Sequence, residues 1–131
     1  MSAASGIIKK GGSIITAADC WDGVPDGSGF SDLLQKAKSA DELLEIIRGE
    51  GFCEPDMWQV QILALILQKA DVYFYSDNLS DEQIRGAFMT PCRNIAETVD
   101  RLVKKYGTSA RICVLPQGPQ TISYLSKPQV D

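Results

Sequence analysis

The chain has 131 residues, of which 44% are apolar and 23% charged, and its formal net charge is -4. This length fits one domain with a single core and leaves no room for a second, so residues 1–131 are expected to form one unit. A mildly acidic chain without a stripe of Lys and Arg interleaved with aromatic residues is not expected to bind nucleic acid.

The sequence also gives no reason to expect a membrane partner. The longest apolar stretch, residues 60–67, is far shorter than the roughly 20 residues that cross a bilayer. The first five residues lack the basic and apolar regions of a secretory signal. A cytoplasmic location is therefore predicted.

Three apolar, β-rich runs along the chain are predicted to be strands, at residues 13–18, 71–75 and 110–115. A fourth, weaker strand is placed near residues 88–90. The loops that follow the three strong runs, 19–23, 76–78 and 116–118, carry most of the unusual residues of the chain. If the strands are parallel, these loops open at one edge of the sheet, where open α/β sheets bind ligands.

Capping residues predict the helices between these strands. Ser39, Ser80 and Asn94 each stand three residues before a Glu or Gln, a pattern that marks helix starts near residues 40, 81 and 95. Residues 55–70 form a helix that is apolar nearly all round, so it is either buried or has a second face that awaits a partner. Short helices are predicted near 31–37 and 2–10, and a frayed tail at 126–131.

This alternation predicts an α/β fold of three layers, with a mainly parallel sheet flanked by helices, of Rossmann-like or flavodoxin-like type. At the predicted edge, Asp19, Asp22 and Asp77 would gather if the first two strands are neighbours. These three acids are candidate residues of a substrate or cofactor cleft, and their oxygens could also hold Mg²⁺. Aspartate is also common in loops for reasons of turn formation alone. Trp21 and Trp58 have the same two interpretations, core packing or the wall of a pocket.

The glycine-rich loop 23–29 has a similar ambiguity. Its glycines would allow backbone amides to approach a phosphate. It lacks both the Gly-Lys-Ser/Thr of a P-loop and the third glycine of a dinucleotide-binding fingerprint. A flexible connector is the alternative.

The reactive residue types are few. The four cysteines are widely scattered, so no structural disulfide is expected, and Cys113 is predicted to be buried in the third strand. The chain contains no histidine, the commonest metal ligand and general base. No metal ligand or catalytic residue is assigned to this chain.

Several collinear motifs resemble one family. They are 10–15 (KGGSII), 55–59 (PDMWQ), 72–77 (VYFYSD) and 114–118 (VLPQG), together with Met1 to Ala4, Asp22-Gly23 and Gly29-Phe30. Over essentially the whole chain they resemble the C-terminal domain of the nickel-dependent lactate racemase family.

This resemblance implies the C-terminal half of a two-domain 2-hydroxyacid racemase or epimerase that uses a nickel-pincer nucleotide. In the family, the nickel-binding histidine, the lysine that tethers the cofactor and the proton-shuttling histidines belong to the N-terminal domain, so none is expected here. Trp58 matches a family tryptophan that lines the active-site cleft. The implied partners are that N-terminal domain, in cis or in trans, and a small 2-hydroxyacid. The isolated chain is expected to be inactive, to hold no cofactor alone, and to be able to self-associate through its apolar face.

Two alternatives remain open at this point. One is a stand-alone flavodoxin-like or receiver-like module that binds Mg²⁺ through Asp19, Asp22 and Asp77, although a receiver needs five strong strands. The other is a separately encoded subunit that completes a racemase site in trans.

Overall fold

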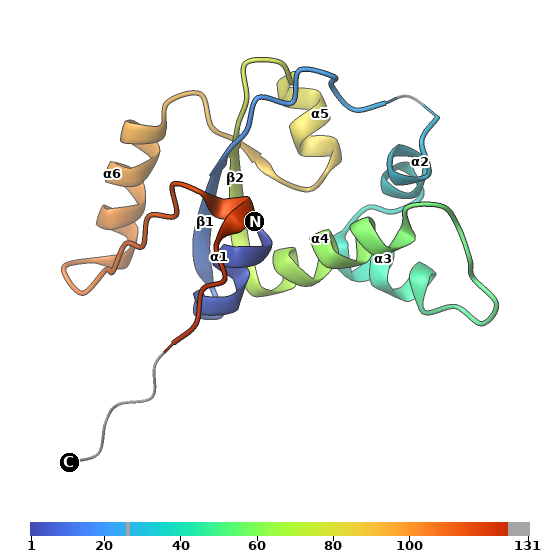
Figure 1. The fold of residues 1–131 in the computed structure, drawn as a ribbon, viewed down its shortest axis with the longest axis horizontal. Helices are drawn as coiled ribbons and strands as arrows, with labels where there is room; N and C mark the ends of the chain where they lie inside the picture. Colours follow the sequence, from blue (N-terminus) through green and yellow to red (C-terminus); the bar gives the residue numbers. More distant parts are fainter. Residues whose placement is uncertain (26, 126–131) are drawn as a thin grey trace, which may run out of the picture.

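A computed structural model describes residues 1–25 and 27–125 (Figure 1). The predicted tail at 126–131 lies outside the described residues. The elements in chain order are α1 (Ser2–Ile7), β1 (Gly12–Ala17), α2 (Gly29–Gln35), α3 (Ala40–Ile47), α4 (Met57–Lys69), β2 (Ala70–Tyr75), α5 (Asp81–Gly86), β3 (Thr90–Pro91), α6 (Ile95–Tyr106) and a 3-10 turn, η1 (Gly118–Gln120). In the described part of the chain, no helix combines the length and the apolarity needed to cross a membrane.

The sheet has the strand order β1-β2-β3, and both pairs are parallel. Alternate residues of β2 point to opposite faces, as the pleat requires. Val72 and Phe74 are buried on the face that packs against α4 and α5. On the other face, the guanidinium of Arg101 in α6 lies 5.4 Å from the centre of the Tyr73 ring. Helices therefore cover both faces, which confirms the three-layer α/β prediction.

The helix starts at 40, 81 and 95 are confirmed by their caps. The side chains of Ser39, Ser80 and Asn94 accept hydrogen bonds from backbone N–H groups three residues on, at 3.1–3.2 Å. Only Ser80 forms the complete capping box, in which the side chain of Gln83 accepts a bond from the N–H of Ser80 at 2.9 Å. These starts were predictable because each depends on residues within one helical turn.

A second core lies outside the sheet, between α2, α3 and α4. Its fully or nearly fully buried members are Leu33, Leu34, Leu43, Leu44, Ile47, Val60, Leu63, Ala64 and Ala87. Helix α4 buries one face here and leaves its opposite face uncovered by the described residues. Trp58, Ile62 and Leu65, spaced one helical turn apart, are 59%, 41% and 46% exposed. We call these three residues the α4 stripe.

The predicted third strand at 110–115 is wrong. The segment pairs with no strand among the described residues, and Ile112, Cys113 and Val114 are exposed. Cys113 is thus not a buried residue. The third strand is instead the short β3, within two residues of the weak strand predicted at 88–90. Met89, just before β3, packs against all three apolar clusters of the molecule and holds that segment beside β2.

Gly29 permits the close approach of α2 to the loop before α4. A Cβ atom at this position would lie 2.2 Å from the carbonyl oxygen of Pro55. We expect Gly29→Ala to lower the free energy of unfolding by about 2 kcal/mol, because the backbone of Pro55 must move to relieve the overlap. Urea unfolding of the two chains measures the difference.

Gly86→Ala is the matched control. It is also a helical glycine, but a Cβ there would meet nothing within 4 Å, so a change of no more than about 0.5 kcal/mol is expected. Equal losses in the two variants would contradict a steric role for Gly29.

Candidate functional site

Hydrogen bonds join the carboxyl-terminal ends of β1 and β2. The N–H of Ala18 donates to the carbonyl oxygen of Tyr75 at 3.0 Å. The Ser76 hydroxyl donates to the carbonyl oxygen of Asp19 at 2.7 Å, and the Asn78 amide donates to both that oxygen (3.0 Å) and the Asp19 carboxylate (2.8 Å). The two strand-end loops therefore form one connected platform.

The predicted acids lie at this edge but do not form a metal centre. The Asp77 carboxylate accepts a hydrogen bond from the Tyr75 hydroxyl at 3.0 Å, and this bond raises the pKa of Tyr75. Asp22 is exposed in the turn that follows β1. Among the described residues, no group of three or more His, Cys, Asp or Glu side chains could hold a metal ion. The carboxylates of Asp19 and Asp77 instead accept hydrogen bonds from Asn78 and Tyr75, so the described residues give the receiver-like alternative no support.

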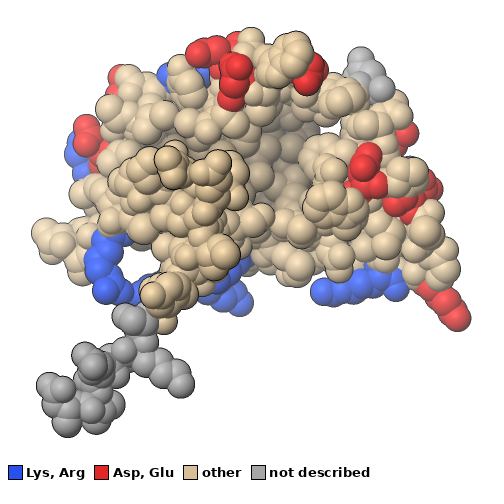
Figure 2. All heavy atoms as spheres, in the orientation of Figure 1, with Lys and Arg blue, Asp and Glu red and all other residues tan. Residues whose placement is uncertain are grey.

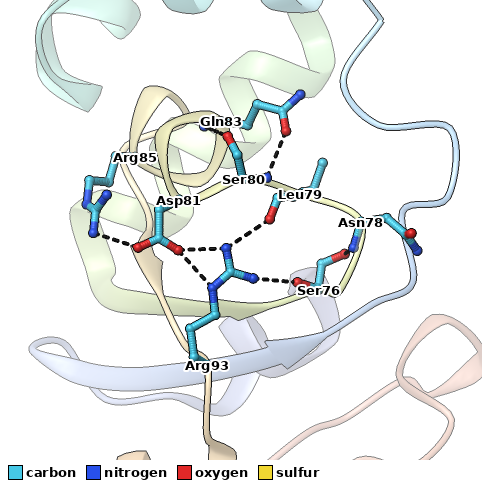
Figure 3. Close-up of polar contacts among 8 residues, drawn as sticks. All are labelled: Ser76, Asn78, Leu79, Ser80, Asp81, Gln83, Arg85 and Arg93. Atoms are coloured by element: carbon cyan, nitrogen blue, oxygen red, sulfur yellow. Dashed lines mark hydrogen bonds and ion pairs between the residues drawn. The ribbon is translucent and has the colours of Figure 1, made fainter.

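Arg93 holds the loop after β2 in place (Figure 3). Its guanidinium donates to the Asp81 carboxylate from Nε at 2.8 Å and lies 2.6 Å from it at Nη2. It also donates to the carbonyl oxygens of Ser76 at 2.9 Å and Leu79 at 3.0 Å. One side chain thus ties the start of α5 to both ends of the loop that carries Asp77 and Asn78.

Arg93 was missed by the sequence interpretation. Arg93 is the second residue after β3, just as Asp19 and Asp77 are the second residues after β1 and β2. Its position after the weak strand predicted at 88–90 could have identified it, because the polar residues that follow parallel strands lie at the same edge of the sheet.

We expect Arg93→Gln to destabilise the chain by about 1–2 kcal/mol, since several charge-assisted bonds are lost from a half-exposed side chain. Hydrogen exchange should accelerate at residues 76–80 more than in α4. Arg101→Gln is the control, because the guanidinium of Arg101 lies over the ring of Tyr73 and is not among the groups that bind residues 76–80 in Figure 3. Equal acceleration of hydrogen exchange at residues 76–80 by the two substitutions would contradict this role of Arg93.

The ion pair between Arg93 and Asp81 predicts that the stability of the fold depends on pH. Hydrogen bonding from Arg93 lowers the pKa of Asp81 below its ordinary value of 3.8. A lowered folded-state pKa stabilises the fold above the unfolded value, and this stabilisation is lost as the pH falls through the folded value. Asp81→Asn should therefore narrow the gap between stability at pH 6 and at pH 2, as measured by urea midpoints. An unchanged gap would contradict this.

A groove of about 470 Å³ runs beside this cluster, lined by Arg85, Arg93, Arg101 and the start of α6. Its cations already have partners: Arg85 and Arg93 bind Asp81, and Arg101 stacks on Tyr73. In the described part of the glycine-rich loop, the Ser31 N–H at the start of α2 already donates to the side chain of Ser28. The phosphate interpretation finds no support in the described part of this loop.

The loop at 116–118, predicted to join the strand-end edge, lies elsewhere. Residues 116 and 117 form a turn, and η1 follows beside α1 at the amino terminus (Figure 1). This prediction failed together with the strand that was expected to precede it.

Trp58 lies in the first turn of α4, whose last turn leads directly into β2 (Figure 1). It therefore belongs to the helical part of the molecule rather than to the strand-end platform. Figure 2 shows this face hollowed between the sheet and the helical part, with acids along the edge of the strand-end loops and Lys and Arg along the opposite edge. An exposed indole on a well-packed helix can wall a pocket but cannot transfer a proton.

The described residues do not fit a nickel-nucleotide centre. The chain has no histidine, and no three potential ligands converge among the described residues. What this chain offers is a rigid platform and an apolar stripe.

Comparisons with known proteins agree with these features. A family model described as the lactate racemase C-terminal domain matches residues 1–123. The lactate racemase of Thermoanaerobacterium thermosaccharolyticum is 33% identical over 93% of this chain, and that of Lactiplantibacillus plantarum is 31% identical over 90%. These matches cover 29% and 28% of the two relatives.

A solved structure supports the same assignment. The lactate racemase apoprotein from T. thermosaccharolyticum superposes on 95% of this chain with a TM-score of 0.77 at 31% identity, and 29% of that protein is covered. The chain thus spans less than a third of the length of the racemases it matches. It belongs to the lactate racemase C-terminal domain family.

Proposed function

We propose that this chain is the cleft-closing domain of a two-domain, lactate racemase-like 2-hydroxyacid racemase or epimerase. The observation that carries the proposal is the α4 stripe, in which Trp58, Ile62 and Leu65 are exposed on a helix whose other face is fully packed. Large apolar side chains that share one exposed face are typical of interaction surfaces. Family membership indicates a partner, since the relatives are more than three times longer.

In this proposal the chain supplies surface rather than reactive groups. The α4 stripe packs against the rest of the enzyme, and Trp58 lines the cleft where a small 2-hydroxyacid binds. Closure of such a cleft excludes water from the reacting centre. The nickel-pincer nucleotide is assigned to the remaining part of the enzyme, because the donor groups it requires are not gathered in the described part of this chain. The proposal holds whether that remaining part is joined in cis or binds in trans.

A chimera tests the proposal. Residues 1–131 replace the matching C-terminal part of the T. thermosaccharolyticum lactate racemase, and interconversion of D- and L-lactate is measured. The chimera should racemise lactate, whereas this chain alone and the shortened racemase alone should not. Racemisation of any 2-hydroxyacid by the isolated chain would overturn the proposal, as would a folded, cofactor-loaded chimera that leaves lactate unchanged.

A further inference from the structure

Residues 110–125, which we call the C-terminal segment, contain five exposed large hydrophobic residues. Ile112 and Val114 are 64% and 75% exposed, and Ile122, Tyr124 and Leu125 are 92%, 83% and 73% exposed. Ile112 and Val114 are two residues apart, as are Ile122 and Tyr124, which is the spacing of side chains on one face of a strand. The segment therefore has the side-chain pattern of a strand, but it pairs with no strand among the described residues.

The composition of the C-terminal segment is that of a buried element. Its sixteen positions include a single charged residue, Arg111. Solvated surface segments are normally rich in charge, and contiguous exposed apolar surface marks interaction sites. The segment also lies largely within residues 1–123, which match the family model, so it is part of the family domain.

The backbone of the C-terminal segment is held at few points. Its bonds to the preceding chain and to α1 are from the Ala110 N–H to Gly107 and from the Ser123 hydroxyl to Ala3. Residues 111–115 and 121–125 form neither a helix nor a strand. The beginning of β1 is flanked by Tyr106, whose hydroxyl bonds to the Gly11 carbonyl oxygen at 3.0 Å and to Ser13 at 2.7 Å. The segment turns from α6 towards α1 instead of lying along β1 (Figure 1).

We propose that the C-terminal segment docks on the remaining part of the racemase as an added strand, with Ile112 and Val114 and then Ile122 and Tyr124 buried in its core. This inference rests on the proposed function and adds a second contact to the α4 stripe. Extended segments bind in this way through main-chain hydrogen bonds, with alternate side chains giving specificity. The occupant is the rest of the enzyme, because the relatives extend over more than three times the length of this chain.

Cys113 provides a native probe of this docking. It is exposed at the centre of the segment, and Cys92 is buried, so alkylation by iodoacetamide followed by peptide mass spectrometry distinguishes them. In the isolated chain, Cys113 should react at the rate it shows in the urea-unfolded chain. In the active chimera, its reaction should slow at least about tenfold, as expected for a thiol made inaccessible.

Each other outcome rejects the inference in a distinct way. An active chimera with a reactive Cys113 overturns the C-terminal docking and leaves the proposed function standing. An inactive chimera with a reactive Cys113 overturns both. Protection in the isolated chain at every concentration would mean pairing with its own β1 edge, and protection that grows with concentration would mean pairing with a second copy; either overturns the choice of partner.

A double variant tests the same surface without chemical modification. Because Ile112 and Val114 are exposed in the isolated chain, I112D/V114D should leave its thermal unfolding unchanged but reduce racemisation by the chimera at least about tenfold. Ile95→Asp is the control, since Ile95 is 38% exposed at the start of α6, where a carboxylate suits the helix dipole. Equal activity of the double variant and this control would reject the docking.

Discussion

Trp58→Ala is expected to reduce lactate racemisation by the two-domain chimera about tenfold to a hundredfold, while leaving the unfolding of the isolated chain nearly unchanged. The indole is 59% exposed in this chain, so its removal loses little buried surface here. If docking buries it, truncation loses roughly 1.5–3 kcal/mol of apolar burial, and each 1.36 kcal/mol in the barrier is about tenfold in rate. The measurements are kcat/KM for lactate and the thermal midpoint of each chain.

Trp21→Ala is the matched control for this prediction. Trp21 is an equally large indole and is 77% exposed, but it lies in the turn after β1. Its truncation should leave both racemisation and stability nearly unchanged if the α4 stripe, and not the strand-end platform, faces the cleft. Equal losses from the two tryptophans would place the cleft across both surfaces and contradict the special role of α4.

The features predicted correctly from the sequence are those set by neighbouring residues. Ser39, Ser80 and Asn94 marked helix starts because a cap bonds to a backbone N–H within its own turn. The apolar character predicted for the helix at residues 55–70 is also found in α4. For α4, the sequence left two outcomes open, and the uncovered stripe of Trp58, Ile62 and Leu65 is the second of them.

The features predicted wrongly depend on distant partners. The run at 110–115 has the residues of a strand. An alternating apolar pattern predicts that one face of a strand is buried, but it does not identify the surface against which that face packs. The surroundings of the strand-end acids could not be predicted for a related reason. The carboxylates of Asp19 and Asp77 accept hydrogen bonds from Asn78 and Tyr75. The directions of these two donor side chains cannot be predicted from the spacing of residues in the sequence.

Leu43→Ala is expected to cause the largest loss of stability, about 3 kcal/mol in the free energy of unfolding. Leu43 is completely buried in the core between α2, α3 and α4. Truncation of a buried leucine costs about 2–5 kcal/mol, because apolar burial is lost and a cavity remains where the surrounding helices cannot collapse. Urea unfolding should show a lower midpoint with an unchanged slope.

Leu65→Ala separates this packing role from the chemistry of the substitution. The same atoms are removed, but Leu65 is 46% exposed on the α4 stripe, so the isolated chain should lose no more than about 1 kcal/mol. In the chimera the order of effects should reverse for activity measured well below the unfolding temperature, because the proposed function places Leu65, and not Leu43, against the partner. If Leu43→Ala instead lowers racemisation more than Leu65→Ala in a fully folded chimera, then activity depends on the packing of α4 against its own core and not on contacts made by the α4 stripe. The docking surface would then have to be sought on the C-terminal segment alone.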